Sequence, residues 1–433
     1  METKKIEKMR GALRGEITIP ADKSISHRSV LFSALGKGKT HVKNFLEAAD
    51  CLSSAACMRA LGADVERVGE GEYIINGCGL RGLKEPSIVL DAGNSGTTLR
   101  LSMGMLAGQP FLTTFMGDAS LSRRPMGRVI KPLAQMGANI RGREGDKLLP
   151  ITILPKHTPL QAIQYDSPVA SAQVKSAILL AGLYADGDTT VRELYVSRDH
   201  SERMLSAFGA KLKREGSAVT ISPAEELVSP EEIIVPGDIS SAAFWLVAGS
   251  VIEGSDLLLK NVGVNPTRTG ILDVLFDMGA KLELLDARVS GGEPVADIHV
   301  QAHGLKGVYF GAEIIPRLVD EIPIIAVAAL FAEGDTVIEG AGELRVKETD
   351  RLSAILTALN ALAPGSVEER GDGLIIHGGR PLKHAKVDSY DDHRMAMALS
   401  VAGAAGAGAD IEKPSCVRIS YPSFYEELER LSR

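Results

Sequence analysis

The stretch "SAQVKSAILLAGLYADGDTTVREL" at residues 171–194 has a form that recurs along the chain, and this recurrence decides the fold. It starts with polar residues typical of a helix start, continues as an apolar helix, and makes a Gly-Asp-Thr turn into a short strand. The segment "SRDHSERMLSAFGAKL" at 197–212 then predicts a second helix that ends in Gly-Ala before another strand. One copy therefore has the content of a small α/β layer.

Related copies occur at a spacing of roughly seventy to eighty residues, which is longer than the common solenoid repeats. They share the apolar helix after a polar start, the turn that follows it and, in most copies, the Gly-Ala helix end. The six copies begin at Lys23, Asn94, Ser171, Ser240, Asp320 and Asp392. The sequence therefore predicts an α/β fold of six similar units.

The repeat also settles the meaning of "SALGKGKT" at residues 33–40, which ends like a phosphate-binding Walker loop. That motif requires a glycine where Ser33 stands, and its loop must precede a helix. Here the predicted helix "HRSVLFSAL" comes before the glycines. In other copies the same place is a turn that leads into a strand, so we interpret this segment as a turn and strand.

Two similar segments predict the domain boundaries. A chain of 433 residues is too long for one ordinary core, so we expect two domains. "ITIPADKS" at 17–24 and "IIVPGDIS" at 233–240 each place a proline between an apolar strand and a helix start. Because proline ends a strand and stiffens the link, each segment suits a crossing between domains. We expect one domain from 22–235, another from 1–21 plus 236–433, and an active site in the cleft between them.

Composition excludes several classes of function. The chain is 45% hydrophobic and 24% charged, with a net charge of −7 and no run of basic residues, which argues against a nucleic-acid partner. No apolar run is long enough to span a membrane, and the first residues lack the apolar core of a secretory signal. The cysteines lack metal-site spacing, so we expect reduced thiols at Cys51, Cys57, Cys78 and Cys416. We therefore expect a cytoplasmic protein.

Cations accompany the starts of the predicted helices. Ser, Asn and Asp are common helix caps, and for Ser240 and Ser241 we interpret them as plain caps. Capping does not explain the basic residues near the other starts, because helix N-termini already carry partial positive charge and attract anions. Arginine adds a bidentate grip on phosphate and carboxylate. The pattern indicates a small, highly anionic ligand, such as one or two phosphorylated carboxylic acids, near Lys23, Arg28, Arg100, Arg124, Lys175, Arg198, Lys347, Arg351 and Arg394.

Two acidic residues, Asp320 and Glu348, lie among these cations in the sequence. Carboxylates so placed suit proton transfer, although each could equally be a salt-bridge partner only. "DDHR" at 391–394 could be imagined as a metal-ligand set. Adjacent residues of a helix face different ways, so we expect no metal site there.

Nine motifs taken together carry a resemblance to a known family. The chain resembles the enolpyruvyl transferases, and among them the divergent (class II-like) branch of the 5-enolpyruvylshikimate-3-phosphate synthases. The motifs cover nearly the whole chain in order: "DKSISHR", "DAGNSGTTLR", "SRRPMGR", "SAQVKSAILLAG", "SRDHSERM", "VDEIPIIAVAA", "LRVKETDRL", "DDHRMAMA" and "SYPSFYEEL".

The resemblance implies a fold of two domains, each with three βαβαββ units about a pseudo-threefold axis, an inside-out α/β barrel. It also implies a reaction of the shikimate pathway, which serves chorismate and aromatic amino-acid biosynthesis. In that reaction the enolpyruvyl group of phosphoenolpyruvate moves to the 5-hydroxyl of 3-phosphoshikimate, and phosphate is released. The resemblance implies no metal and no organic cofactor, and we expect a monomer.

The resemblance assigns site residues one by one. As catalytic groups it implies Lys23, Asp320 and Glu348, with Asp320 as the base at the 5-hydroxyl. For 3-phosphoshikimate it implies Lys23, Ser24, Arg28, Ser171, Ala172, Gln173, Arg198, Asp320 and Lys347. For phosphoenolpyruvate it implies Lys23, the backbone around Gly96, Arg124, Gln173, Arg351 and Arg394.

The sequence departs from part of the family near its C-terminus. Some members carry a phosphoenolpyruvate-binding lysine where Ile419 stands here, and whether Arg418 or Lys413 substitutes is open. "NSGTT" in place of "NAGTA" also favours the divergent branch, so inhibitor sensitivity does not follow from the resemblance.

Two alternative functions remain. One is the sister transferase that acts on UDP-N-acetylglucosamine. That family has a Lys-Asn pair where this chain has Lys23-Ser24, and it has a reactive loop cysteine. The other is a non-catalytic anion-binding module.

Overall fold

The computed structural model describes residues 2–290 and 292–431. Contacts divide the chain into two compact units. The middle unit comprises Ala21–Val235 with Val289–Glu293, and the terminal unit comprises Met1–Pro20, Pro236–Arg288 and Pro294–Arg433. Within the described ranges, every helix is too short or too polar to cross a membrane.

The middle unit contains three sheets among its described residues. In the first the strands pair in the order β14 (Leu227–Val228), β3 (Gly36–Lys43), β5 (Glu72–Cys78) and β4 (Asp64–Gly69), with β15 (Glu232–Ile234) also on β3. In the second the order is β6 (Leu90–Asp91), β7 (Thr113–Met116), β9 (Leu148–Ile153) and β8 (Ile140–Gly142). In the third it is β10 (Gln164–Ser167), β11 (Thr189–Glu193), β13 (Ala218–Ile221) and β12 (Leu212–Glu215).

The terminal unit contains three further sheets within the same described ranges. In the first the strands pair in the order β17 (Lys281–Ser290), β18 (Glu293–Gln301), β16 (Asp256–Gly263) and β2 (Arg14–Thr18). In the second the order is β19 (Tyr309–Phe310), β20 (Asp335–Ile338), β22 (Gly373–His377) and β21 (Val367–Arg370). In the third it is β1 (Thr3–Ile6), β24 (Ala409–Glu412) and β23 (Ala385–Asp388).

All six sheets follow one plan. In each sheet one strand pairs in parallel with one neighbour and antiparallel with the other, as β7 does with β6 and β9. A parallel pair requires a crossover, and an apolar helix supplies it between β6 and β7, β10 and β11, β19 and β20, and β23 and β24. The parallel partners β3 and β14, and likewise β2 and β16, are instead separated by most of the middle unit. In the last sheet β23 and β24 form the parallel pair, and the antiparallel neighbour is β1 from the start of the chain. The prediction of six similar α/β units is confirmed.

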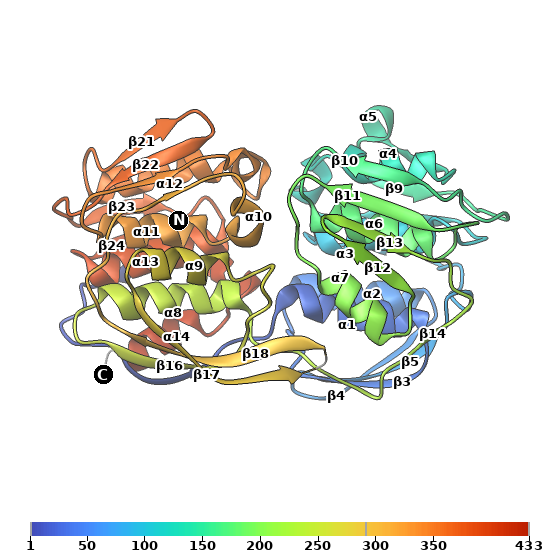
Figure 1. Cartoon of the computed structure of the whole chain (residues 1–433), viewed down its shortest axis with the longest axis horizontal. Helices are drawn as coiled ribbons and strands as arrows, with labels where there is room; N and C mark the ends of the chain where they lie inside the picture. Colours follow the sequence, from blue (N-terminus) through green and yellow to red (C-terminus); the bar gives the residue numbers. More distant parts are fainter. Residues whose placement is uncertain (1, 291, 432–433) are drawn as a thin grey trace. The chain divides into compact units, whose positions relative to one another are not determined.

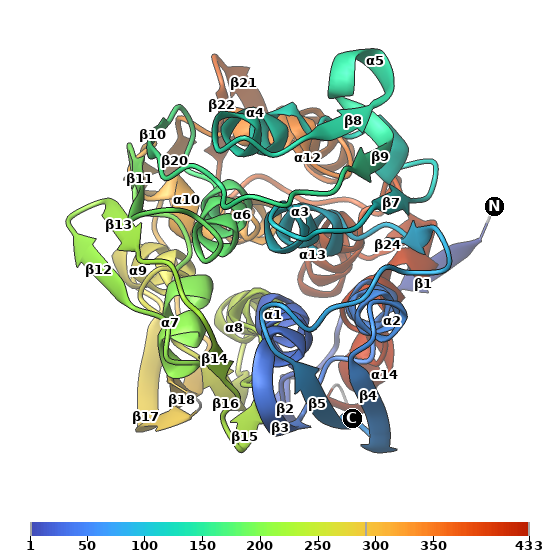
Figure 2. The same cartoon turned by 90° about the vertical axis from the view of Figure 1, so that its right-hand side faces the viewer.

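The six helices predicted from the copies form the interior of the two units. In the middle unit these are α1 (Lys23–Leu35), α3 (Gly96–Leu106) and α6 (Ala172–Gly182). Figure 2 shows them nearly end-on, with strands at the periphery of that unit. In the terminal unit α8 (Ile239–Val251), α11 (Ile322–Leu330) and α13 (His393–Ala405) pack on one another, with strands around them (Figure 1). Most of their residues are buried, which explains why these helices are largely apolar on all sides, although α1 also buries His27 and Arg28.

The other helices lie between strands of a copy, except α14, which follows the last strand. They are α2 (Ala49–Ala60), α4 (Gly127–Gln135), α5 (Arg143–Asp146), α7 (His200–Ala207), α9 (Gly270–Asp277), α10 (Ile315–Leu318), α12 (Arg351–Leu362) and α14 (Phe424–Leu431). Short 3₁₀ helices span Leu121–Arg123, Gly342–Val346 and Pro414–Ile419. The glycines of "SALGKGKT" lie in β3, after α1, so the segment is not a Walker loop.

Ser240 and Ser241 do not cap α8, contrary to the prediction. The cap is Asp238, which is extended in backbone and accepts a hydrogen bond from the Ser240 backbone N–H. At the matching place Asp22 caps α1 and accepts from the Ile25 N–H. A carboxylate caps as well as a hydroxyl does and also complements the helix dipole. The two Pro-small-Asp segments thus end their strands and begin helices in the same way.

Candidate functional site

In the terminal unit the predicted site residues gather around the guanidinium of Arg351, the first residue of α12. The side chain is 1% exposed, so each of its polar hydrogens needs a partner. Its Nε donates to Asp392 Oδ2 over 2.8 Å, its Nη1 to Asp320 Oδ1 over 3.2 Å and its Nη2 to Glu348 Oε2 over 2.9 Å. One arginine therefore orients three carboxylates.

The carboxylate of Asp320 lies near three cations of this unit. Besides Arg351, its carboxylate lies 3.7 Å from Lys347 Nζ and 3.8 Å from Arg394 Nη2. Arg394 Nη1 also donates to the Asp320 backbone carbonyl over 3.3 Å. Asp320 keeps 14% of its side chain exposed and Lys347 keeps 25%, so solvent reaches both groups. The cluster has the arrangement that binds phosphate or carboxylate beside a potential base.

Burial and neighbouring charges shift the pKa values of this cluster in opposite directions. Burial alone would raise the pKa of Asp392, but the charges of Arg351 and His393 outweigh it, so the pKa lies below its ordinary value. Burial would lower the pKa of Arg351, but Asp392, Glu348 and Asp320 raise it. Arg351 and Asp392 are therefore a charged pair at all ordinary pH values.

In the middle unit Arg28 is held rigidly inside α1. Its Nε donates to Ser201 Oγ over 2.8 Å, its Nη1 to the Ser24 carbonyl over 2.9 Å and its Nη2 to Ser176 Oγ over 3.1 Å. Burial lowers its pKa to about 10, although nearby carboxylates, Glu202 foremost, partly offset this. These three bonds go to neutral oxygens, so they fix the guanidinium and leave its charge available to an anion.

Lys23, the first residue of α1, pairs with Asp50 of α2 over 3.2 Å. Its side chain is 22% exposed and that of Asp50 is 12% exposed, so the pair is reachable from solvent. The pairing orients the ammonium group at the helix start, beside Ser24. Asp50 was not predicted as a site residue, because nothing in "AADCLSSA" marks it as a partner of Lys23.

Gly96 lets an arginine approach the start of α3. A Cβ at this position would lie 2.6 Å from Arg100 Nη1. Arg100 Nη1 donates to Gln173 Oε1 over 2.7 Å, and Gln173 Nε2 donates to Thr97 Oγ1 over 2.9 Å. The starts of α3 and α6 are therefore linked by side chains. The sequence marked Arg100 as a cation near a helix start but did not assign it to the site.

Arg124 follows the 3₁₀ turn Leu121–Arg123 and reaches back to the same helix start. Its Nη2 donates to Asn94 Oδ1 over 2.7 Å and to Ser120 Oγ over 3.3 Å. Its Nη1 lies 3.8 Å from where a Cβ on Gly96 would stand. Two guanidinium groups and the first N–H groups of α3 thus share one place, which favours an anion there.

Ser171 and Ala172 open α6, and both are half-buried. The Ser171 N–H donates to Glu193 Oε1 over 3.1 Å. The other oxygen of Glu193 accepts from Ser197, the residue before Arg198. Arg198 is itself half-buried. The two segments predicted to bind a phosphate are therefore joined through one buried carboxylate.

The structure brings all five predicted residues of the terminal unit into one cluster: Asp320, Lys347, Glu348, Arg351 and Arg394. In the middle unit the predicted residues form local groups at the starts of α1, α3 and α6. Lys413 pairs with Asp388 over 3.0 Å and with Asp391 over 3.7 Å. Asp392 was missed, although its place at the N-cap of α13 was visible in "DDHR".

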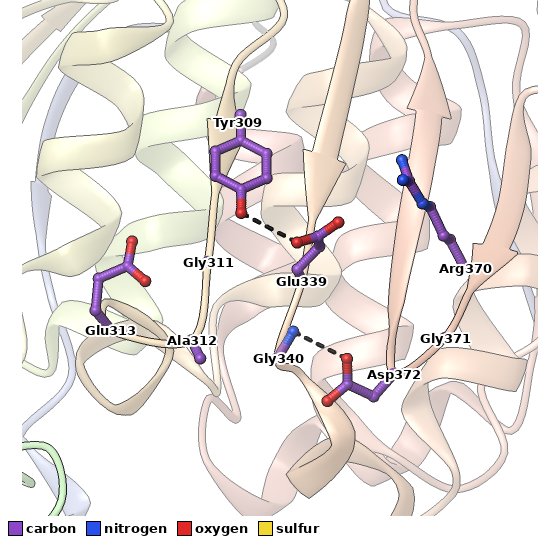
Figure 3. Close-up of a pocket in the computed structure, with 9 residues that line it drawn as sticks. All are labelled: Tyr309, Gly311, Ala312, Glu313, Glu339, Gly340, Arg370, Gly371 and Asp372. Atoms are coloured by element: carbon purple, nitrogen blue, oxygen red, sulfur yellow. Dashed lines mark hydrogen bonds between the residues drawn. The ribbon is translucent and has the colours of Figure 1, made fainter.

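A pocket of 460 Å³ lies in the terminal unit, apart from the predicted residues. Figure 3 shows the carboxylates of Glu313, Glu339 and Asp372 around it. The Tyr309 hydroxyl donates to Glu339 over 3.0 Å, and the Gly340 N–H donates to Asp372 over 3.1 Å. Three acidic side chains against the single cation of Arg370 in its lining do not suit an anionic ligand.

Comparison with known proteins places the chain beside one family. The family model described as EPSP synthase (3-phosphoshikimate 1-carboxyvinyltransferase) matches residues 8–428. A 3-phosphoshikimate 1-carboxyvinyltransferase of Bacillus cereus (strain 03BB102) is 51% identical over the full length of both chains. A protein of the same name from Bacillus anthracis (strain A0248) is also 51% identical over the full length of both.

Solved structures show the same architecture. The EPSP synthase from Acinetobacter baumannii superposes with a TM-score of 0.90 at 43% identity, covering 100% of this chain and 98% of that one. The enolpyruvyl transferase NikO from Streptomyces tendae has a TM-score of 0.79 at 17% identity, covering 99% of this chain and 96% of that one. The second likeness bears on the fold alone, which is the two-domain enolpyruvyl transferase fold.

Proposed function

The chain belongs to the EPSP synthase family, whose members are 3-phosphoshikimate 1-carboxyvinyltransferases, and we propose which of its charged residues bind each substrate and which transfer protons. The activity is transfer of the enolpyruvyl group of phosphoenolpyruvate to the 5-hydroxyl of 3-phosphoshikimate, with release of phosphate. It belongs to the shikimate pathway and so serves aromatic amino-acid biosynthesis. The observation that carries the proposed division is the convergence of Arg351, Lys347 and Arg394 on Asp320.

The anionic groups of 3-phosphoshikimate bind mainly to residues of the middle unit in this proposal. Arg28 is supported because its guanidinium is buried and oriented by neutral oxygens. The free N–H groups at the start of α6 favour a phosphate beside Ser171 and Ala172, with Arg198 as its cation. The remaining residues proposed for this substrate are Lys23, Ser24, Gln173, Asp320 and Lys347.

The cations proposed for phosphoenolpyruvate are divided between the two units. In the middle unit the start of α3 at Gly96 joins Arg124, while Lys23 and Gln173 touch both substrates. In the terminal unit Arg351 and Arg394 grip the carboxylate or phosphate of phosphoenolpyruvate. Because Arg351 is already fixed by Asp392 over 2.8 Å, it loses little freedom when it binds an anion.

The reaction proceeds by addition and then elimination. Asp320 takes the proton of the 5-hydroxyl while the oxygen of that hydroxyl attacks the central carbon of phosphoenolpyruvate. A proton from Glu348 or Lys23 goes to the methylene carbon, which gives a tetrahedral intermediate. Loss of phosphate, with return of a methyl proton to the group that protonated the methylene carbon, restores the double bond. The fixed cations stabilise the developing charge without having to reorganise.

Both compact units contribute residues to the proposed sets, and we treat them as the two domains of the enzyme. The protein acts as a monomer in the cytoplasm in this proposal. A non-catalytic anion-binding module would need the cations but not the carboxylates Asp320 and Glu348 among them. The terminal-unit cluster contains both kinds of group, which favours catalysis.

The test is phosphate release from phosphoenolpyruvate, measured with and without 3-phosphoshikimate. We expect release only when 3-phosphoshikimate is present, together with formation of 5-enolpyruvylshikimate 3-phosphate. UDP-N-acetylglucosamine in place of 3-phosphoshikimate is the control substrate and should give no release. Release with UDP-N-acetylglucosamine, or binding of both anions without any release, would contradict the proposal and favour one of the alternatives.

A further inference from the structure

Glu193 is the last residue of β11 and has no place in the reaction, yet its buried carboxylate joins two segments of the proposed substrate site. Its Oε1 accepts from the backbone N–H of Ser171 over 3.1 Å. Its Oε2 accepts from both the backbone N–H and the hydroxyl of Ser197, over 3.1 and 2.9 Å. One side chain thus ties the start of α6 to the residue that precedes Arg198.

Lys175 holds this carboxylate in place. Its ammonium group lies 2.9 Å from Glu193 Oε2 and donates to the Ser197 carbonyl over 3.2 Å. It also lies 2.9 Å from Glu202 Oε1. Lys175 and Glu193 are each 2% exposed in their side chains, so solvent does not weaken their attraction as it would at the surface.

The carboxylates of Glu193 and Glu202 make different contacts. Glu193 bonds to both substrate-binding segments as well as to Lys175. Glu202 lies in α7, and the polar groups that its carboxylate meets are those of Lys175 and Arg214. A role in balancing the charge of Lys175 would belong to both carboxylates. A role in joining the two segments belongs to Glu193 alone.

We propose that Glu193, oriented by Lys175, is a positioning residue that sets the spacing of the phosphate-binding segments at Ser171 and Arg198. This rests on the proposed function, in which those segments bind the phosphate of 3-phosphoshikimate. Glu193 does not touch the substrate. It fixes the two segments before binding, so the free energy of ordering them is not lost from the affinity.

The first test compares the wild-type enzyme with Glu193→Gln. The amide keeps the shape, but its NH₂ group cannot accept from Ser197, so the connection between the segments is broken. Calorimetry should show about tenfold or more weaker binding of 3-phosphoshikimate, because a charge-assisted bond and its ordering effect are lost. In steady-state kinetics the KM for 3-phosphoshikimate should rise, while kcat and the KM for phosphoenolpyruvate stay within about twofold.

Glu193→Asp provides a second variant if the glutamine variant does not fold. It keeps the negative charge near Lys175 but is one methylene too short to reach both segments. We expect it to fold and to lose affinity for 3-phosphoshikimate in the same way. Unchanged affinity in this variant would overturn the proposal, as would an equal loss of kcat and of affinity for both substrates.

Glu202→Gln is the matched control, because it removes the other carboxylate from Lys175. It should weaken 3-phosphoshikimate binding less than Glu193→Gln does, because it removes no link between the segments, although the charge of Glu202 also acts on Arg28. An equal loss in Glu202→Gln and Glu193→Gln would overturn the proposal in favour of charge balance at Lys175.

Arg198→Ala distinguishes failure of the positioning role from failure of the proposed 3-phosphoshikimate site. If Arg198→Ala leaves 3-phosphoshikimate binding intact, the proposed site fails. If it weakens binding and Glu193→Gln does not, only the positioning role fails.

Discussion

Arg351 and Asp392 lie 41 residues apart in the sequence and form a buried ion pair, with Arg351 Nε donating to Asp392 Oδ2 over 2.8 Å. The same carboxylate caps α13, because its Oδ1 accepts from the N–H groups of Arg394 and Met395. One buried residue therefore fixes the starts of two helices and two of the arginines proposed to bind phosphoenolpyruvate. The geometry of the proposed anion site therefore depends on this contact.

Asp392→Asn should separate the two roles of this residue. An asparagine still caps α13, since its side-chain oxygen accepts the same bonds, but the charge opposite Arg351 is lost. Because Asp320 and Glu348 still contact Arg351, we expect a loss of about 1–3 kcal/mol in the free energy of unfolding at pH 7. Urea denaturation measures this loss.

The matched control is Asp350→Asn, the same substitution at the N-cap of α12. The side chain of Asp350 is 38% exposed and pairs with a surface arginine, Arg345. We expect a loss below about 1 kcal/mol there, because surface ion pairs contribute little. Equal losses in the two variants would mean that the buried pair adds no stability of its own.

The depressed pKa of Asp392 also predicts a pH dependence. A carboxyl group whose pKa is lower in the folded than in the unfolded state stabilises the fold above its unfolded pKa, which is about 3.9. That stabilisation is lost as the pH falls through the folded value. The difference in stability between the wild type and Asp392→Asn should therefore be constant from pH 7 to pH 5 and shrink below about pH 4. A difference that shrinks between pH 7 and pH 5 would contradict this.

His27 predicts a pH dependence in a higher range. The ring is buried, its Nδ1 lies 2.8 Å from Ser54 Oγ, and burial lowers its pKa to about 3. The unfolded chain binds a proton there below about pH 6.5 and the folded chain does not, so acid favours unfolding. Between pH 6 and pH 5 the wild type should lose up to about 1.4 kcal/mol more stability than His27→Asn. Unfolding curves of the two proteins that shift in parallel with pH would show that His27 is not buried in its neutral form.

Gly96→Ala should weaken binding of phosphoenolpyruvate without harming the fold. The new Cβ would lie 2.6 Å from Arg100 Nη1, so the flexible side chain must move away from the start of α3. We expect the KM for phosphoenolpyruvate to rise about tenfold, as when a well-formed anion contact is lost. Stability should stay equal or rise slightly, because alanine favours a helix over glycine.

Gly127→Ala is the control for this substitution. Gly127 is also the first residue of a helix, α4, and a Cβ there would have nothing within 4 Å. Its kinetic constants should match those of the wild type. If Gly96→Ala also matches the wild type, Arg100 can move without cost and the close approach at Gly96 has no part in binding.

The sequence predicted much of the fold because the fold is a repeat. Each copy carries its own apolar helix, turn and strand, so local patterns recur at the places where α1, α3, α6, α8, α11 and α13 form. The cap residues were misplaced at α8, because the serines at 240 and 241 are strong caps in isolation. Asp238 takes that role since Pro236 and Gly237 end the preceding segment earlier than the serines suggest.

The residues that support the site could not be predicted in the same way. Asp392 and Arg351, or Glu193 and Ser171, meet only after separate copies have folded and packed. β1 likewise completes the last sheet by pairing with β24 from the other end of the chain. Such contacts depend on topology rather than on local pattern, so a sequence shows the charged residues but not their partners.

The most direct test of the proposed mechanism is the turnover of Asp320→Asn. Asparagine keeps the size of Asp320, which lies 3.2 Å from Arg351, but it cannot take the proton of the 5-hydroxyl. Glu313→Gln, which changes a carboxylate of the same unit outside the cluster around Arg351, is the control and should behave as the wild type. With both substrates saturating, we predict that Asp320→Asn lowers kcat by about 10²–10⁴-fold while calorimetry still detects 3-phosphoshikimate binding. A kcat within about tenfold of the wild type would show that Asp320 is a salt-bridge partner only and would contradict the proposed role of Asp320 as the base.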